Sequence, residues 1–334
     1  MDREILKREQ VITLIKDTFS AELVKELNLV KVSSPLVVLD GTGINDDLNG
    51  VERPVKFPIK CLEEKPAVVV HSLAKWKRMR LKELDVEVGR GIVTDMRALR
   101  PDEDYSPIHS IYVDQWDWEK HIEPEQRNLE FLKKTVSKIY NAIKHTEQIV
   151  HDHYKKIMTS LPEKITFIHA EELLQKYPGR TAKQRENEAA KEFGALFIIG
   201  IGGKLSDGCP HDGRAADYDD WSTKNDDGYN GLNGDIILWN PVLECAFEVS
   251  SMGIRVDKKA LQHQLKEKDC EHRKSLLFHK QLLHGELPES IGGGIGQSRL
   301  CMFMLKGRHI GEVQVSIWPD RERAHAEEAG IHML

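Results

Sequence analysis

The sequence predicts one α+β domain over residues 1–334, with a mostly antiparallel sheet flanked by helices. Short apolar runs bounded by Gly, Pro, Asn or Asp recur along the chain and are typical of strands. Longer segments with apolar residues three or four positions apart are typical of amphipathic helices. Several strand-like runs follow one another without a helix between them, which favours hairpins. No repeat, low-complexity tract or linker divides the chain, so we expect a single domain.

The N-terminal half begins with a predicted amphipathic helix over residues 4–27, which carries Val11, Ile15, Phe19 and Leu23 at helical spacing. Pro and Gly residues then break the chain into shorter elements. These are an extended segment at 35–43, strands at 55–60 and 67–70, a helix at 73–84 with Ser72 as its candidate N-cap, strands at 89–100 and 109–118, and a long helix at about 123–154.

The C-terminal half contains short strands at 165–170 and 195–200 with helical material beside them. Residues 203–234 form a long polar loop rich in Gly and Asp, and loops of this length in compact domains are usually functional. The remaining elements are an antiparallel pair at 235–240 and 243–256 that turns at Asn240-Pro241, helices at about 258–268 and 272–284, and a glycine-rich stretch at 291–300 that leads into the last helix.

Charge and composition exclude several classes of protein. The formal net charge of −6 argues against a nucleic-acid binder driven by net charge, so we expect no nucleic-acid partner. No apolar run approaches the length of a membrane span and the N-terminus is polar, so we expect no membrane partner and no secretory signal. The five cysteines are scattered without a C-x-x-C pair, which favours reduced thiols and a cytoplasmic location.

The glycine-rich stretch IGGGIGQSRL, residues 291–300, looks like a phosphate cradle but fits neither common type. A dinucleotide-binding G-x-G-x-x-G would need a third glycine where Arg299 stands, and a βαβ unit does not fit the remaining chain. A P-loop would need a lysine beside the last glycine. Glycines followed by an arginine at the start of an apolar run therefore need another explanation.

Other polar stretches could carry chemistry, although each also has a plain structural reading. The basic run HSLAKWKRMRLK is compatible with a solvated helix face, and MRALRPDED with a surface ion-pair cluster. Strand alternation places Gln115 and Asp117 on one face, as an ammonium site would need, but an edge strand facing water would look similar. Asp235 and Glu248 lie on adjacent candidate strands, where paired carboxylates can hold Mg²⁺.

In chain order, these stretches resemble the catalytic core of the class II aminoacyl-tRNA synthetases. Arg100 and the acids after it resemble motif 2, and GGGIGQSRL with Arg299 resembles motif 3. Within that superfamily, VVHSLAKWKR, ALRPDED, VDQWDWE, ADYDDWST and EVSSMGIRVD are similar to the family of ammonia-dependent asparagine synthetases, the aspartate–ammonia ligases. The resemblance runs from the N-terminal helix to about residue 318, and the tail at 320–334 matches nothing.

The resemblance implies a class II synthetase-like fold and an enzyme that joins L-aspartate and ammonia with ATP and Mg²⁺, through β-aspartyl-AMP, releasing AMP and pyrophosphate. It also implies a homodimer whose interface is formed largely by helix 4–27 and the strand that follows it, although the apolar stripe of that helix could equally pack within one chain. By motif, Arg100 and Arg299 would grip ATP, with Ser251 and Gly294 beside the nucleotide, and Asp235 and Glu248 would hold Mg²⁺.

For aspartate, the resemblance implies that Gln115 and Asp117, assisted by Ser72, bind the α-ammonium group, and that Lys77 and Arg255 bind the α-carboxylate. Asp46 and Asp219 would receive ammonium or accept its proton, and Arg214 would neutralise nearby charge. Free ammonia is the expected donor, because residue 2 is Asp and Cys209 lacks a nucleophile elbow. Two alternatives stay open: an enzyme like aspartyl- or asparaginyl-tRNA synthetases that acts on the α-carboxylate, and a synthetase-like binding protein.

Overall fold

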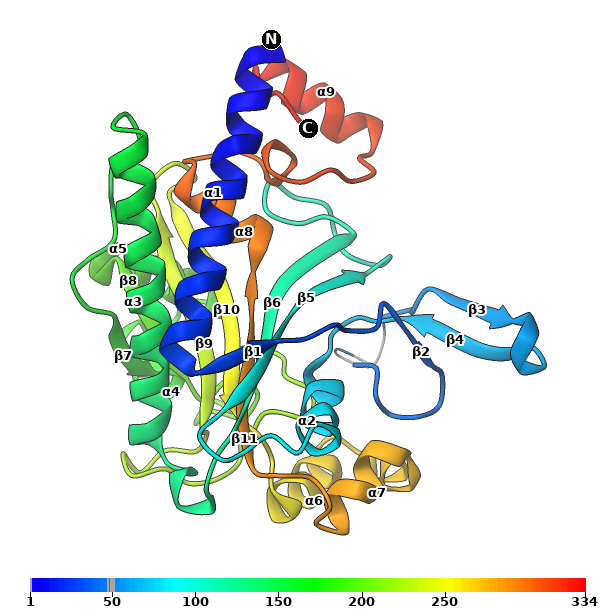
Figure 1. Cartoon of the computed structure of the whole chain (residues 1–334). Helices are drawn as coiled ribbons and strands as arrows, with labels where there is room; N and C mark the ends of the chain where they lie inside the picture. The colour runs from blue at the N-terminus through cyan, green and yellow to red at the C-terminus, as the bar shows by residue number, and fades with distance from the viewer. Residues whose placement is uncertain (1, 47, 49–51) are drawn as a thin grey trace.

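A large, strongly twisted sheet forms the centre of the molecule (Figure 1). The computed structural model describes residues 2–46, 48 and 52–334. Within them the sheet has eight strands, parallel only in the edge pairs β1–β5 and β7–β8, so the predicted mostly antiparallel sheet is confirmed. In spatial order the strands are β1 (Leu29–Lys31), β5 (Gly91–Leu99), β6 (Tyr112–His121), β11 (Ser290–Gly296), β10 (Cys245–Ile254), β9 (Asn233–Asn240), β8 (Ala195–Ile199) and β7 (Thr166–His169).

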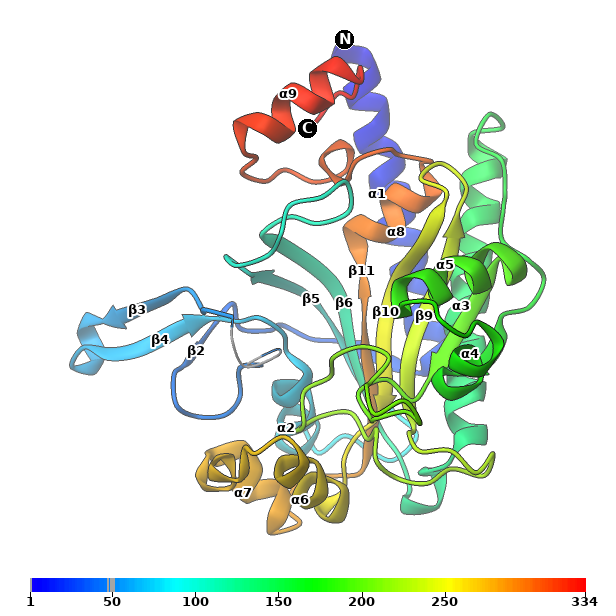
Figure 2. The same ribbon diagram turned by 180° about the vertical axis from the view of Figure 1, so that it is seen from behind.

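One face of the sheet is covered by the helices α1 (Asp2–Leu27), α3 (Leu129–His153) and α8 (Gln297–Met304) (Figures 1 and 2). The apolar stripe predicted for the first helix packs here, since Ile15, Phe19 and Leu23 are fully buried in the main hydrophobic core. The ring centroid of Phe19 lies 4.6 Å from that of Trp116 on β6. This stripe therefore packs within its own chain.

The other face of the sheet is only partly covered, which leaves room for a site. At one end, α4 (Ala170–Lys176) and α5 (Ala182–Phe193) pack against β7 to β10. At the other end, α2 (Ala74–Glu83) packs against β5, β6 and β11. The helices α6 (Lys258–Glu267) and α7 (Leu277–Leu283) lie beyond α2, and a small sheet of β2 (Val37–Leu39), β4 (Lys65–Val69) and β3 (Lys56–Ile59) projects sideways (Figure 2).

The structure corrects several predicted elements. The glycine-rich stretch is a central strand, β11, and α8 is not the last helix, because α9 (Asp320–Glu328) follows it. Leu73, not Ser72, occupies the N-cap position of α2. The predicted helix at 272–284 is broken at Leu276, which has extended backbone. The short 3₁₀ helices are η1 (Lys60–Leu62), η2 (Pro124–Gln126), η3 (Glu271–Ser275) and η4 (Ile310–Glu312).

The hairpin prediction holds only in part. Strands β5 and β6, and strands β9 and β10, are neighbours in both sequence and space, and Asn240 pairs with Cys245 beside the predicted turn. By contrast, β11 is inserted between β6 and β10, far from both in sequence. No helix in the described part of the chain is long and apolar enough to cross a lipid bilayer.

Candidate active site

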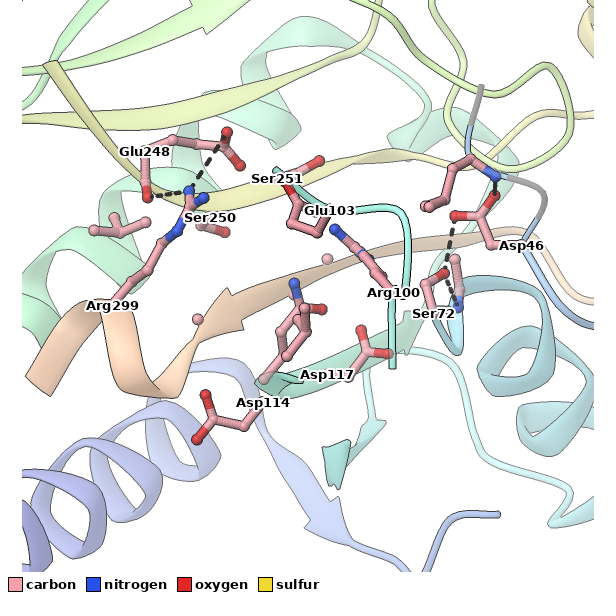
Figure 3. A pocket seen from close by; sticks show the side chains of 18 of the residues that line it. Asp46, Ser72, Arg100, Glu103, Asp114, Asp117, Glu248, Ser250, Ser251 and Arg299 are labelled. Atoms are coloured by element: carbon pink, nitrogen blue, oxygen red, sulfur yellow. Dashed lines mark hydrogen bonds and ion pairs between the residues drawn. The ribbon is translucent and has the colours of Figure 1, made fainter. Parts of the chain in front are cut away.

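A cavity of about 420 Å³ opens on the uncovered face of the sheet. Figure 3 shows Glu248 and Arg299 at one end of it and Asp46 and Ser72 at the other, with Arg100 between them. Every predicted site residue lines this cavity except Asp235, which is buried just behind it. The predicted residues that line it are Asp46, Ser72, Lys77, Arg100, Gln115, Asp117, Arg214, Asp219, Glu248, Ser251, Arg255, Gly294 and Arg299.

Strands β6 and β11 form the floor of the cavity, and the glycines of β11 make room for the side chains of β6. A Cβ atom on Gly294 would lie 2.2 Å from Gln115 Oε1, and one on Gly292 would lie 1.9 Å from Glu119 Oε2. Such contacts are far inside van der Waals distance, so a larger residue could not stand there without displacing these polar groups. Glu119 is the third side chain on this strand face and was not predicted, although period two extends from Gln115 through Asp117 to it.

Lys77 and Arg255, the two side chains predicted to bind the α-carboxylate of aspartate, are both paired with carboxylates of the protein. Arg255 donates to both Glu119 oxygens, with its NH2 group 2.8 Å from Oε2, and also contacts Asp219. Burial would raise the pKa of Glu119, but the Arg255 guanidinium, Lys77 and the Ser290 hydroxyl together outweigh burial, so the pKa is lowered. Lys77 contacts Asp117 and donates to the carbonyl oxygens of Trp118 (2.9 Å) and Gly293 (3.1 Å).

Arg214, which also lines the cavity, is the centre of a second group of contacts, with side chains of β9, β10 and the loop before them. It contacts Asp235 at 2.5 Å and Asp219 at 3.5 Å, and its NH1 group donates to Ser251 Oγ at 2.6 Å. Asp219 therefore lies between two arginines, Arg214 and Arg255, and the residues predicted from separate stretches form one connected network.

Asp46 closes the far end of the cavity and is only 2% exposed. Its carboxylate accepts hydrogen bonds from Ser72 Oγ (3.1 Å) and from the backbone N–H of Leu48 (3.0 Å). Ser72 thus holds Asp46 rather than capping a helix. Burial raises the pKa of Asp46, which makes this carboxylate a better proton acceptor than an exposed one. Tyr218 also lines the cavity and was not predicted.

Arg299 is held at the opposite end by groups that sequence reasoning did not assign. Its NH1 group donates to the carbonyl oxygen of Glu248 (3.0 Å), and its NH2 group lies 2.7 Å from His109 Nε2. An arginine cannot accept a hydrogen bond, so His109 must be neutral with its proton on Nδ1, which faces Ser106 Oγ at 2.7 Å. Burial and the nearby Arg299 charge lower the pKa of His109 to about 4.

Glu103, which follows Arg100 in ALRPDED, lines the same end, and burial raises its pKa. No local pattern distinguishes Glu103 from the neighbouring acids, and nothing in the sequence places His109 beside Arg299. Both assignments depend on how the loop after β5 folds over the sheet.

The chemistry of Asp235 and Glu248 fits a divalent cation. They lie on the adjacent strands β9 and β10, where Ser251 pairs with Asp235 and Glu248 with Ile237. Burial, together with the charge of Glu248, raises the pKa of Asp235 to about 7. Two carboxylates that disfavour each other's charge suit a divalent cation. Among the described residues no third His, Cys, Asp or Glu completes a metal cluster, so further ligands would have to come from substrate or water.

The comparison with known families supports one reading of this cavity. Residues 6–330 match the family described as aspartate-ammonia ligase. The chain is 55% identical over 331 residues to an aspartate–ammonia ligase of Bacteroides thetaiotaomicron, covering 99% of this chain and 96% of that protein. It is 54% identical over 326 residues to one of Clostridium perfringens, covering 98% and 94%. The chain belongs to the aspartate–ammonia ligase family. It is an enzyme of the ligase class.

Solved structures establish the class II synthetase fold for this aspartate–ammonia ligase family member. An asparaginyl-tRNA synthetase from Pyrococcus horikoshii, solved with asparaginyl-adenylate, superposes with a TM-score of 0.69 at 15% identity, over 94% of this chain and 70% of that one. An aspartyl-tRNA synthetase from Entamoeba histolytica gives 0.59 at 14% identity, over 92% and 57%. The predicted class II aminoacyl-tRNA synthetase-like fold is confirmed.

Proposed function

We propose that the protein makes L-asparagine from L-aspartate, ammonia and ATP through β-aspartyl-AMP, with release of AMP and pyrophosphate. The observation that carries this proposal is a cavity with Arg299 at one end, the buried carboxylate Asp46 at the other and Arg100 between them. Membership of the aspartate–ammonia ligase family supports the overall reaction. A carboxylate that attacks a phosphate needs its charge offset and its approach aligned, and the half-buried side chains of Arg100 and Arg299 can supply both.

On this proposal, Arg100 and Arg299 bind the phosphates of ATP, since a guanidinium stays charged and donates hydrogen bonds in pairs. Gly294 and Ser251 lie beside the nucleotide. Asp235 and Glu248 would hold Mg²⁺, which when bound offsets phosphate charge. The fit of these two carboxylates to a cation is supported by the raised pKa of Asp235.

On the same proposal, aspartate binds at the floor of the cavity. Gln115 and Asp117 accept hydrogen bonds from the α-ammonium group, with Ser72 assisting, and Lys77 and Arg255 attract the α-carboxylate. Arg255 can still do so although it is paired with Glu119 and Asp219, because a guanidinium has five N–H groups and those pairs do not use all of them. The β-carboxylate is then left pointing toward ATP.

Asp46 and Asp219 would receive ammonium and take its proton, so that neutral ammonia attacks the acyl phosphate. The raised pKa of the buried Asp46 supports a role as the proton acceptor. Arg214 would limit the negative charge around Asp219. The loop at 203–234, which carries Arg214 and Asp219, would cover the intermediate and keep water from hydrolysing it. We further propose that the protein is a cytoplasmic homodimer that binds no nucleic acid.

The test is product formation by the purified protein with L-aspartate, ATP, Mg²⁺ and either ammonium or glutamine, resolving amino acids and nucleotides together. Asparagine with AMP and pyrophosphate, formed from ammonium and hardly from glutamine, is the expected result. Trapping with hydroxylamine should give the β-hydroxamate of aspartate. An α-hydroxamate would instead identify an enzyme like tRNA synthetases, and no turnover with no pyrophosphate exchange would identify a binding protein.

A further inference from the structure

Gln314 has a buried side-chain amide beside the first turn of α8, close to Arg299 in the chain, and lies outside every motif that the proposed function uses. It follows η4, lines the cavity and is 6% exposed. Its Oε1 atom accepts a hydrogen bond from Ser110 Oγ at 2.5 Å. Its Nε2 group donates to Ser298 Oγ at 3.0 Å and to the carbonyl oxygen of Tyr112 at 3.2 Å.

These bonds allow only one orientation of the amide. If the amide were turned over, its oxygen would face the carbonyl oxygen of Tyr112, and two acceptors would oppose each other. Burial makes that arrangement costly, since an unpaired polar group inside a protein loses its hydration without compensation. Gln314 therefore fixes the relative positions of the segments that carry its partners.

The partners of Gln314 belong to the two segments that carry the arginines proposed to bind ATP, and the N–H of Arg100 donates to the carbonyl oxygen of Ile111, the residue after Ser110, at 2.8 Å. Ser110 ends the loop that begins at Arg100, and Ser298 directly precedes Arg299 in the first turn of α8. The backbone N–H of Ser298 is itself held by Asp114 Oδ1 at 2.9 Å, so this turn is anchored to β6 as well. One side chain thus joins the loop of Arg100 to the helix of Arg299.

The segment that carries Gln314, residues 309–318, is attached firmly enough to act as a support. The N–H of Ile310 donates to the carbonyl oxygen of Pro107 at 2.7 Å, and the hydroxyl of Tyr105 donates to the carbonyl oxygen of Ile317 at 2.7 Å. The ring of Trp318 packs edge-on against that of Tyr105, with centroids 5.8 Å apart. The loop at 101–109 is therefore braced along its length by this segment.

We propose that Gln314 is a positioning residue that sets the distance between the loop of Arg100 and the first turn of α8, and so tunes the affinity for ATP. This inference rests on the proposed function, because it takes the nucleotide to bind between Arg100 and Arg299. Gln314 touches neither arginine in the structure's hydrogen bonds and acts through Ser110 and Ser298.

The test replaces Gln314 with methionine, which keeps the length of the side chain and removes its hydrogen bonds. Loss of these bonds should raise the KM for ATP on the order of ten-fold, while the KM for aspartate stays within about two-fold of its original value. Ser316→Ala is the matched control on the same segment, since the Ser316 hydroxyl has no hydrogen-bond partner among the described residues. It should leave both constants unchanged.

Binding of ATP without aspartate, measured by calorimetry, separates this inference from the proposed function. Weaker binding by the Gln314→Met variant than by the original protein supports the inference, and equal binding with equal KM values overturns it. No ATP binding by the original protein would overturn the proposed function and this inference together. If Gln314→Met does not fold, Ser110→Ala removes the same bond from the other side, and an unchanged KM for ATP in that variant would be equally decisive.

Discussion

Arg255 stands between Glu119 and Asp219 with its side chain almost fully buried, so its charge depends on those partners. Burial lowers the pKa of an arginine, but here the two carboxylates outweigh burial and the pKa of Arg255 is raised. An arginine with one partner removed would keep its charge in a poorly solvated place. The pairing of Arg255, which follows β10, with Glu119 on β6 therefore contributes both to the cavity and to the stability of the sheet.

Substitution of Glu119 with glutamine should lower the free energy of unfolding by roughly 3 kcal/mol at pH 7, because it removes one charge of a buried ion pair. Urea denaturation of the variant and the original protein would measure the difference. Glu87→Gln is the control, since Glu87 is exposed and its loss should change little. An equal loss in both variants would contradict the buried-pair explanation.

The raised pKa of Asp235, about 7, predicts a pH-dependent affinity for Mg²⁺. Below that pH the carboxyl group is protonated, and the proton must leave before a cation can bind, so affinity should fall as the pH drops. We expect the half-saturating Mg²⁺ concentration to rise several-fold between pH 8 and pH 6. The Asp235→Asn variant should bind Mg²⁺ more weakly and lose this pH dependence, and a constant half-saturation in the original protein would refute the prediction.

Among the elements, β11 has the most unusual composition for its place, since a run of glycines forms a central strand of the sheet. Glycine weakens a strand, so its use here needs a reason. The reason lies on β6, whose polar side chains occupy the space that Cβ atoms on Gly292 and Gly294 would take. Strand β11 therefore lacks side-chain packing on this face, and the polar side chains of β6 fill the space and form the floor of the cavity.

Gly294→Ala should therefore raise the KM for aspartate more than that for ATP, because the new Cβ atom displaces Gln115 from the floor. We expect an increase of at least about ten-fold, the cost of one charge-assisted hydrogen bond. Steady-state kinetics with each substrate varied in turn would show it. Gly307→Ala is the control, since its nearest neighbour is the flexible side chain of Met302 at 3.2 Å. A rise confined to the KM for ATP would assign Gly294 to the nucleotide alone.

Helix α1 supports the sheet from the opposite face through Phe19, which is fully buried against Trp116. Phe19→Ala should lower the free energy of unfolding by about 3–5 kcal/mol, because it removes a large side chain from a packed core. Thermal and urea denaturation would measure the loss. Thr13→Ala, on the exposed side of the same helix, should cost well under 1 kcal/mol. Similar losses in both variants would mean that the helix is not held through this stripe.

At the scale of the whole molecule, β1 forms an outer edge of the large sheet and, among the described residues, pairs only with β5. Val30 on that edge and Leu36 and Leu39 nearby are 40–53% exposed, an apolar surface that a second subunit could cover. The apolar stripe of α1 packs internally, so a second subunit would have to contact other parts of this region. We propose that the exposed edge of β1, the strand that follows the helix, contributes to the predicted homodimer interface.

We expect a solution mass of twice 38.2 kDa by light scattering after size exclusion. Val30→Asp should shift the mass toward that of one chain, because it puts a charge into the apolar edge. Leu6→Asp, an equally apolar position at the far end of α1, is the control. A mass of one chain for the original protein would disprove the homodimer.

Sequence alone could locate nearly all of the cavity. Gln115 and Asp117 follow strand alternation, and the order of the motifs identified Arg100 and Arg299. His109, Glu103 and Gln314 could not be found this way, since their roles depend on contacts with residues distant in the chain. Ser72 was expected to cap the helix that follows it, but its hydroxyl donates to Asp46, a contact that a local helix signal could not reveal.

The sequence by itself determined the α+β class, most helices and strands, the family and the residues around the cavity. These depend on local periodicity and on motifs whose members lie close together in the chain. Only the tertiary structure decided that the glycine run is a central strand, that α1 packs inward and that Arg255 is paired with Glu119. Strand order and ion pairing depend on burial and charge in segments that are far apart in the sequence. A local sequence pattern therefore cannot predict which of these segments will be in contact.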